Sequence, residues 1–482
     1  MPVAHAPRTA DPPRRNRSQK HPRLVYHPGL HFMATPAASS NAGTSLKRAL
    51  TLRDLILYGI IVIQPVAPMS SYGAFADKGH GHAVTAILIA MVAMLLTALS
   101  YGRMARVYPS AGSAFTYVGR ELHPALGYVT GWSMVMDYMV NPLICIIWCS
   151  GQAAKWSGWP KPVWALFFFA LFTGFNLRGV KTSARFNTVL AVAMVGVIVA
   201  FLGAAVRYLM FGDHAPLDFT RPFYDPARWE TRAVFGATAT AVLTYIGFDG
   251  ISTLSEEVEN PRRNILLATV LTCLAIGILS AVQVYVAQLL HPWTEPFGAN
   301  QEVAFGLAAS QAAPWLPLII GSTLLVANTG SGTGAQLGAA RLLYGMGRSG
   351  ALPKSFFGYV SPGTGIPRNN VLVVGGVALF GSFFLSFELG IDLLNFGALI
   401  AFMGVNLAAF VHYFVRQKQH SFSNLVLPLA GFAICGLLWL NLSTMAKIVG
   451  VIWMALGIGY GAWKTSGFRG TLINFDLPPE AG

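Results

Sequence analysis

Two acidic residues, Asp137 and Asp249, each lie in the middle of a long apolar stretch that contains no Lys or Arg. If these stretches cross a bilayer, a charge at the centre costs at least about 2.5–3.5 kcal/mol, so such residues usually face a cavity, a partner or a bound solute. Only these two acids lie well inside such stretches, and no base does. Their carboxyl groups are therefore candidates for binding protons or a cationic substrate.

A structural role for the same two acids is the alternative. Asp249 is flanked by Gly247 and Gly250, and Asp is a favoured N-cap, so it can cap a helix that starts near Gly250. Asp137 can accept hydrogen bonds from nearby backbone or hydroxyl groups. Both roles can coexist in one protein.

Two apolar stretches are interrupted near their centres. The first contains Pro65 and Pro68, and each proline lacks an N–H and clashes with the preceding helical turn. The second contains Gly247 and Gly250, and glycine weakens a helix interior. Kinks alone would explain either interruption. The matched pair, five spans apart, instead predicts a transport site near the midplane of the membrane.

The stretch from Asn328 to Gly334 is rich in small and hydroxyl-bearing residues. Small residues let helices pack closely, which is one interpretation. The other is a set of oxygen ligands for a sodium ion, since hard cations prefer oxygen. On that second interpretation the coupling-ion candidates are Ser331 and Thr333, together with Asp137 and Asp249.

Charged residues follow the second interruption. We predict a solvated helix end there or, alternatively, an inner gate whose ion pairs break during transport. The gate candidates are Arg103, Glu256, Glu257 and Arg262.

The composition predicts a membrane protein, because 54% of residues are hydrophobic and only 11% are charged, against about 25% in soluble domains. This excludes an ordinary soluble enzyme and a disordered chain. Spans must be helical, since lipid offers no partner for backbone polar groups. We predict an all-α integral membrane protein with twelve transmembrane helices, at 51–76, 83–104, 124–150, 163–179, 186–211, 233–255, 265–290, 313–340, 369–387, 390–413, 423–441 and 446–463.

The positive charges predict the orientation. With the N-terminus in the cytoplasm, 25 of the 33 Lys and Arg residues fall on the inner side. We therefore expect both termini in the cytoplasm and the chain in the cytoplasmic (inner) membrane. The net charge of +14 does not indicate a nucleic-acid partner, because half of it lies in a Pro-, Arg- and Ser-rich tail at 1–50. We expect that tail to be disordered. Met33 is an alternative candidate for the first residue.

Nothing in the sequence predicts covalent chemistry. It has no nucleophile–base set, phosphate loop or zinc-ligand spacing, and its four cysteines lie in apolar stretches as small buried residues. We expect no enzyme activity, no metal and no cofactor.

Four blocks of the sequence resemble the amino acid–polyamine–organocation transporters, and the resemblance runs from about residue 47 to 415. The blocks are Tyr108–Tyr117, Gly131–Tyr138, Gly247–Arg263 and Ala340–Pro353. The resemblance implies an inverted repeat of two five-helix units with broken helices 1 and 6, plus two further helices. The implied divisions are a tail (1–50), the two repeats (51–211 and 233–413), two accessory helices (423–463) and a C-terminal tail (464–482).

The resemblance also implies alternating access around a site at the two broken helices. A substrate amine would meet carbonyls near Phe248, Asp249 and Gly250, and a carboxylate would meet amides in the first break. The candidate substrate-binding residues are Gln64, Val66, Ala67, Ser70, Asp137, Tyr138, Tyr245, Phe248, Asp249, Gly250, Ser252 and Asn328.

The chain departs from the family at two points. Amino acid members often have a Gly-rich first break, whereas Pro65 and Pro68 remove two amides here, and this looks more like the putrescine importer branch. Some proton-coupled members carry a lysine midway along the fifth span, and residues 186–206 contain none.

We therefore predict a secondary importer of amino acids, driven by a proton or sodium gradient. A putrescine-type polyamine importer is the close alternative. A membrane sensor or channel that retains the fold is an alternative of another class. The expected partners are the small-molecule substrate, H⁺ or Na⁺, and the lipid bilayer.

Overall fold

The computed structural model describes residues 50–109, 113–179, 184–214, 216–255, 257–348, 352–362 and 364–468, without the side chains of 184–187. Nearly all of the tail predicted at 1–50 therefore lies outside the described residues, as do residues 469–482 of the C-terminal tail.

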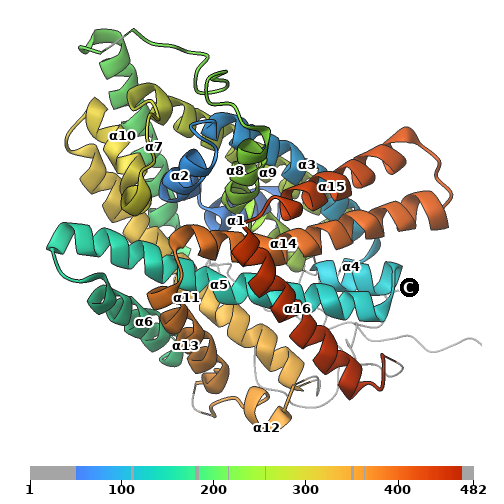
Figure 1. Cartoon of the computed structure of the whole chain (residues 1–482). Helices are drawn as coiled ribbons and strands as arrows, with labels where there is room; N and C mark the ends of the chain where they lie inside the picture. The colour runs from blue at the N-terminus through green and yellow to red at the C-terminus, as the bar shows by residue number, and fades with distance from the viewer. Residues whose placement is uncertain are drawn as a thin grey trace, which may run out of the picture. The chain divides into compact units, whose positions relative to one another are not determined.

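Regular structure in the described ranges is helical, apart from one isolated bridge between Leu50 and Val258. Figure 1 shows the arrangement. The α-helices are α1 (Leu52–Ile63), α2 (Ala67–Lys78), α3 (Ala83–Val107), α4 (Ser113–Glu121), α5 (Pro124–Ser157), α6 (Lys161–Leu177), α7 (Ala184–Phe211), α8 (Thr231–Ala241), α9 (Pro261–Leu290), α10 (Ala304–Ala312), α11 (Leu316–Arg348), α12 (Lys354–Phe357), α13 (Arg368–Phe384), α14 (Phe387–Phe410), α15 (Phe422–Leu440) and α16 (Thr444–Lys464). The 3₁₀ segments are η1 (Val242–Tyr245), η2 (Phe248–Leu254) and η3 (Gly298–Val303), and η4 (Val411–Arg416) is a π-helical continuation of α14.

Within the described ranges, eight helices are long and apolar enough to cross a membrane, and the bent pair of α1 and α2 brings the number up to nine. These nine coincide with nine of the twelve predicted spans. The other three predicted spans coincide with α6 and α13, which are shorter apolar helices, and with the 33-residue α11. Every predicted span is thus helical, while the full count of twelve stays a prediction.

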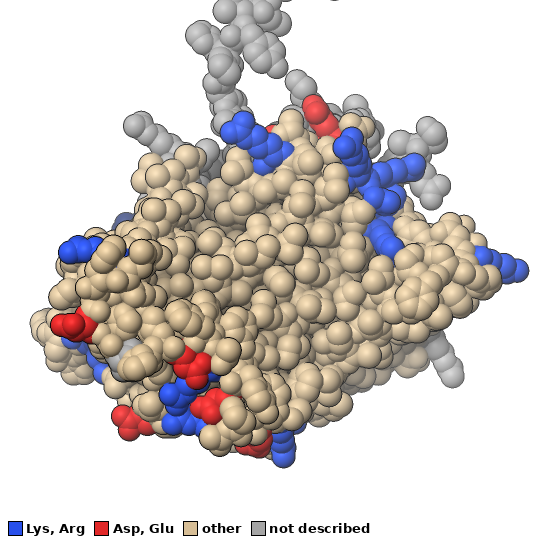
Figure 2. Space-filling model, turned by 90° about the horizontal axis from the view of Figure 1, so that it is seen from above, with Lys and Arg blue, Asp and Glu red and all other residues tan. Residues whose placement is uncertain are grey.

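Charged side chains are sparse over the middle of the face in Figure 2 and gather toward its edges. Such a broad uncharged surface is what a helical bundle presents to lipid, since an exposed charge there would lose its hydration. Large hydrophobic side chains are correspondingly exposed on outward-facing helices, including Phe380 and Phe384 of α13 and Val192 and Val199 of α7.

The core is organised around α5, the long helix that crosses Figure 1 from left to right. It packs against α4, α6, α11, α13 and α14. One close backbone approach is at Gly397 of α14, where a Cβ atom would collide with the carbonyl of Ser133 on α5. Only glycine allows this contact, which lies one turn from Asp137, so it sets how closely α14 approaches the helix bearing that acid.

A buried ion pair joins four further elements. Lys78 Nζ, at the end of α2, lies 2.7 Å from Asp392 Oδ2 on α14 and 3.0 Å from Thr240 Oγ1 on α8. The other Asp392 oxygen accepts a hydrogen bond from Thr240 Oγ1, and the backbone N–H of Ser443, before α16, donates to Oδ2. The side chain of Asp392 is fully buried. The sequence prediction of two acids inside the spans therefore missed a third, because Asp392 stands near the start of its span.

We expect Gly397→Ala to destabilise the protein. The added methyl must displace α5 or α14, and overpacking of this kind typically costs about 1–3 kcal/mol. Gly376→Ala on α13 is the matched control, because nothing lies within 4 Å of its added Cβ. Thermal unfolding of the purified variants in detergent measures both, and equal midpoints would contradict the packing argument.

We expect Lys78→Met to lower stability strongly, because it leaves the buried carboxylate of Asp392 unpaired. Breaking a buried pair typically costs about 3–5 kcal/mol. Lys161→Met breaks the more exposed pair with Glu302 (2.9 Å) and should cost no more than about 1 kcal/mol. The same thermal measurement compares the two variants. A loss no larger for Lys78→Met would show that the buried pair is not a structural lock.

Candidate functional site

The two helix breaks lie against each other. A Cβ atom on Gly247, in the second break, would stand 3.0 Å from Val62 Cγ1 and 3.3 Å from Ile63 Cγ1, at the end of α1. Gly247 also has a φ of +117°, a backbone conformation that residues with a side chain rarely adopt. The glycine is thus required both for the local turn and for the close approach of α1.

The first break spans Gln64, Pro65 and Val66, between α1 and α2, which are bent by 48° relative to each other. Gln64 ends α1 with a φ of +63° and a ψ of +106°, an unusual conformation for a non-glycine residue. Pro68 lies in the first turn of α2, where its missing N–H costs little. The prolines therefore stop one helix and start the next, as the sequence predicted.

Side-chain hydrogen bonds tie the first break to neighbouring helices, and one of them satisfies a backbone carbonyl of the break. Gln283 Nε2, from α9, donates to the carbonyl of Pro65 at 3.0 Å. Gln64 Nε2 donates in turn to the carbonyl of Ala327 on α11 at 3.0 Å. The break is therefore tied to α9 on one side and to α11 on the other. Gln283 is fully buried, and its Oε1 has no partner among the described residues.

The second break consists of Ile246, in extended conformation, and Gly247, between η1 and η2. The helical segment after it begins at Phe248 with Gly247 as its N-cap, rather than near Gly250 as predicted. Asp249 lies in the first turn, and its Oδ1 accepts a hydrogen bond from the N–H of Gly247 at 3.3 Å. The Asp249 carboxyl group thus stabilises the first turn from within the helical segment. The segment starts earlier in the chain than predicted because of the two glycines and its 3₁₀ geometry.

Asp137 and Asp249 share two features, which are their burial and the lack of an ion pair with a described residue. Both residues are buried, at 7% and 6% exposure, and neither forms an ion pair with a described residue. Asp249 directly follows Phe248, whose ring packs edge-on against that of Tyr101, and the N–H of Asp137 would lie 3.2 Å from a Cβ added to Gly397. Within the described ranges the side chain of Asp137 has no hydrogen-bond partner. Two carboxyls that lack a base can hold protons or face cationic groups.

Two tyrosines from other helices lie near Asp249: Tyr58 of α1 and Tyr101 of α3. The Tyr58 hydroxyl would lie 3.8 Å from a Cβ added to Gly250, and the Tyr101 ring packs on Phe248 with 5.6 Å between the ring centres. Tyr138 of α5 follows Asp137 directly in the chain. The hydroxyl of Tyr101 is buried without a described partner, although its ring packs edge-on against Phe248. Aromatic rings beside carboxylates favour ammonium groups, since a cation is attracted to the face of the ring. The arrangement is chemically suited to an amine.

Several predicted binding residues form the wall of this region through their own contacts. The Tyr245 hydroxyl donates to the carbonyl of Ile87 at 2.8 Å, and the Phe248 ring packs on Phe402 at 5.3 Å. The Ser252 hydroxyl lies 2.8 Å from that of Ser113.

The smaller predicted residues lie directly at the breaks. Val66 is buried as the N-cap of α2, and Ala67, which begins that helix, accepts a hydrogen bond from the Ser70 hydroxyl at 2.9 Å. Gly250 faces Tyr58, whose hydroxyl would lie 3.8 Å from an added Cβ. The binding role of the whole predicted set stays a prediction.

The polar residues of α11 face α5. Ser331 Oγ lies 3.5 Å from Asn141 Oδ1, and Asn328 Oδ1 lies 4.0 Å from Cys145 Sγ. Thr333 Oγ1 instead donates to the carbonyl of Thr329 in its own helix at 2.7 Å. The described residues contain no group of three or more His, Cys, Asp or Glu side chains that could hold a metal ion. Coupling-ion ligation by these residues stays a prediction.

Glu256 of the predicted inner gate lies outside the described residues. Among the described ones, Arg103 donates to Asn424 Oδ1 on α15 at 3.2 Å, and Glu257 and Arg262 are in no ion pair. The gate therefore stays a prediction.

Two ion pairs of the structure centre on Glu121, whose side chain is fully buried. It contacts Arg416 at 2.9 Å and His412 at 2.6 Å, and it accepts a hydrogen bond from the hydroxyl of Tyr108 at 2.6 Å. Burial and the hydrogen bond to Glu121 raise the pKa of Tyr108 to about 12. This cluster joins the ends of α3, α4 and α14.

Sequence reasoning missed Tyr58, Tyr101 and Gln283. Gln283 is a polar residue in an otherwise apolar stretch, which is a signal that points to an intramembrane contact. The two tyrosines carry no such signal, because tyrosine is common in membrane helices and only the packing of α1 and α3 brings them to Asp249.

Comparison with known proteins identifies the family of the chain. The model of the amino acid permease family matches residues 63–475. The low-affinity putrescine importer PlaP of Escherichia coli strain K12 is 36% identical over 457 residues, covering 92% of this chain and 99% of the importer. A methylthioribose transporter of Bacillus subtilis is 27% identical, and the branched-chain amino acid permease BcaP of Lactococcus lactis is 26% identical, each covering 87% of this chain and 94% of its relative.

The family match covers most of the chain and includes both helix breaks. The apolar helices identify a multi-pass membrane protein. The chain belongs to the amino acid permease family.

Proposed function

We propose that this protein is a secondary transporter that imports amines or amino acids across the cytoplasmic membrane by alternating access. The observation that carries the proposal is the pair of buried, ion-pair-free carboxyls, Asp137 and Asp249, beside two adjacent helix breaks. The family and the relatives, which include a putrescine importer and amino acid permeases, support the transport of such solutes.

The proposed architecture has twelve spans, with inverted five-helix repeats at 51–211 and 233–413 and with both termini in the cytoplasm. Support comes from the helices that coincide with all twelve predicted spans and from the position of the breaks, one in each proposed repeat. In this arrangement the breaks provide free backbone groups halfway across the membrane.

Between the two substrate classes, the site favours a diamine. Asp137 and Asp249 are both buried, and each carboxyl group can face an ammonium group. A zwitterionic amino acid needs donors for its carboxylate. The first break offers few, because Pro65 and Pro68 have no N–H.

Transport requires that substrate and coupling ion bind the outward-open and inward-open states with different affinities, since only such a difference shifts the equilibrium. We propose that the two carboxyls carry that difference. Filled by a dication or by protons, they lose the electrostatic cost of being charged in a low-dielectric interior, and the bundle can close around them. A channel that retained the fold would need no such cycle.

Uptake into proteoliposomes tests the proposed function. We expect putrescine to accumulate against its gradient and an ionophore that collapses the driving gradient to abolish accumulation. Branched-chain amino acids serve as the competing substrate class. Accumulation of the amino acids alone would contradict the diamine preference, and passive equilibration of every solute would contradict coupled transport.

We expect Asp249→Asn and Asp137→Asn each to reduce uptake at least 10-fold, because each amide removes one negative charge that a substrate ammonium or proton requires. The corresponding loss of interaction is about 1.4 kcal/mol or more. Glu295→Gln, an exposed acid in the 291–298 loop, is the matched control. Thermal midpoints of the purified variants show that they are folded. Unchanged uptake by folded Asp249→Asn would leave that residue only its role in the turn.

A further inference from the structure

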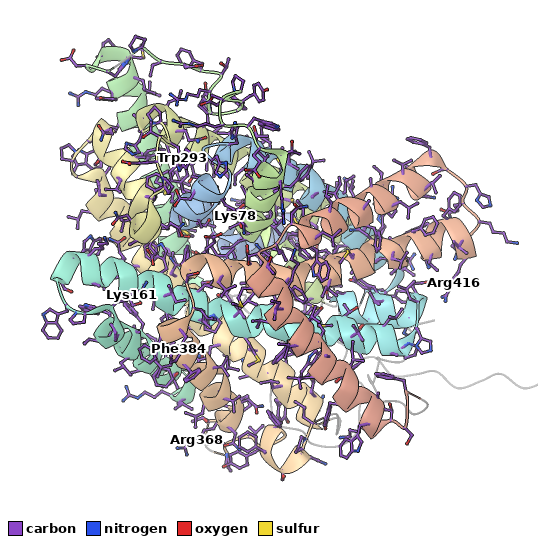
Figure 3. All side chains as sticks on the ribbon, in the orientation of Figure 1. Lys78, Lys161, Trp293, Arg368, Phe384 and Arg416 are labelled. Atoms are coloured by element: carbon purple, nitrogen blue, oxygen red, sulfur yellow. The ribbon has the colours of Figure 1, made fainter. Side chains whose placement is uncertain are left out.

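The segment between α7 and α8 is fastened across the ends of other helices. Its residues 216–230, which we call the strap, consist of turns and irregular backbone. Thr85 Oγ1, in the first turn of α3, donates to the carbonyl of Phe223 in the strap at 2.6 Å. Arg228 of the strap donates to the carbonyl of Trp293, the residue labelled after α9 in Figure 3. The strap therefore lies over the start of α3 and beside the segment that follows α9.

A buried histidine provides a further tether for the strap. His82, the N-cap residue of α3, is 1% exposed, and both of its ring nitrogens are hydrogen-bonded. Nε2 accepts from the backbone N–H of Asp225 in the strap at 3.0 Å, and Nδ1 lies 2.9 Å from the carbonyl oxygen of Gly79, after α2. The Trp229 ring, also from the strap, packs edge-on against the imidazole with 5.0 Å between ring centres. The imidazole is thus enclosed between the strap and the helix ends.

The two hydrogen bonds determine the protonation state of His82. A backbone N–H can only donate, so Nε2 must present a lone pair to Asp225. A carbonyl oxygen can only accept, so Nδ1 must carry the proton that is donated to Gly79. The imidazole is therefore neutral while the strap is fastened. A second proton, on Nε2, would set two N–H groups against each other, and the hydrogen bond to the strap would be lost.

The acids of the strap do not offer the ring a replacement partner. Within the described residues His82 is in no ion pair, and neither ring nitrogen is hydrogen-bonded to a carboxylate. Each acid of the strap contacts another group: Asp218 contacts Thr220, Asp225 contacts Arg221 and Glu230 contacts His80.

The neighbouring helices likewise place no acid against the ring. Asp77, near the end of α2, accepts hydrogen bonds from residues 293–301, and the next residue, Lys78, is paired with Asp392. The first half of α3 has no charged residue. The other titratable groups at these helix ends carry no negative charge, and they are Arg232 of α8, Tyr285 of α9 and His291 after α9.

We propose that His82 is a pH-sensitive latch, which holds the strap closed while its imidazole is neutral and releases the strap when the imidazole binds a second proton. The closed strap is therefore favoured at the higher pH and is lost as the pH falls through about 8 to 5, where imidazoles ordinarily titrate. The strap forms one wall of a cavity of about 350 Å³, so its release opens that cavity to water. On the proposed topology the strap lies outside the cell and the latch responds to external acid.

Hydrogen exchange of the full-length protein in nanodiscs tests the latch. Exchange of the strap amides is measured by mass spectrometry at about pH 7.5 and about pH 5.5, which span the usual titration of an imidazole. Each rate is divided by the intrinsic rate of an unprotected amide at the same pH. We expect the corrected rate to rise about tenfold at the lower pH, because local opening exposes the amides. No transported solute is present, so the result does not depend on the proposed function.

Three variants assign the effect to one residue, and thermal midpoints show that they are folded. His82→Gln keeps an oxygen that can accept from Asp225 but binds no proton, so its strap should stay protected at both pH values. His82→Leu has no acceptor and should exchange rapidly at both. His80→Gln is the matched control, because this partly exposed imidazole contacts Glu230, and it should keep the wild-type response. A wild-type rate that is independent of pH, or a pH response that persists in folded His82→Gln, would overturn the proposal.

Discussion

The structure depends on one constraint: backbone N–H and C=O groups inside an apolar layer must find partners within the protein. Continuous helices meet it locally, and the two breaks cannot. At the first break, Gln283 donates to the carbonyl of Pro65, and the Gln64 side chain ties the break to α11. At the second, Asp249 accepts from Gly247. At each interruption a polar side chain therefore holds backbone groups of the break in place.

The same constraint separates the buried acids by role. Asp392 is paired with Lys78, Thr240 and the backbone of Ser443, so its charge is neutralised and it holds four elements together. Asp137 and Asp249 are also buried, and they have no basic partner in the described ranges. A buried charge without a partner is costly, and proteins retain it where a ligand or a proton supplies the missing charge. The contrast between the three acids separates the structural role of Asp392 from the binding role proposed for Asp137 and Asp249.

Charged side chains join helices at two further places in the bundle. In Figure 3, Trp293 lies at the upper left, Lys161 at the left, Arg368 at the lower left and Arg416 at the right. Near Arg416 the Glu121 cluster ties together the ends of α3, α4 and α14, and at the opposite end Lys78 ties α2 to α8 and α14. Ion pairs thus hold the helices together at these two places. Elsewhere the helices are held by packing and, at the breaks, by hydrogen bonds.

The sequence by itself determined the class of protein, the positions of the helices and both interruptions, because apolar length and Pro or Gly placement act locally. It also identified Asp137 and Asp249, since a charge in an apolar stretch is visible without a structure. Only the tertiary structure decided which groups meet. Tyr101 reaches Asp249, Gln283 reaches Pro65 and Lys78 reaches Asp392 because helices distant in the chain pack side by side. Periodicity and composition carry no information about those partners, since the angle and depth of each helix are set by contacts such as that of Gly397 with Ser133.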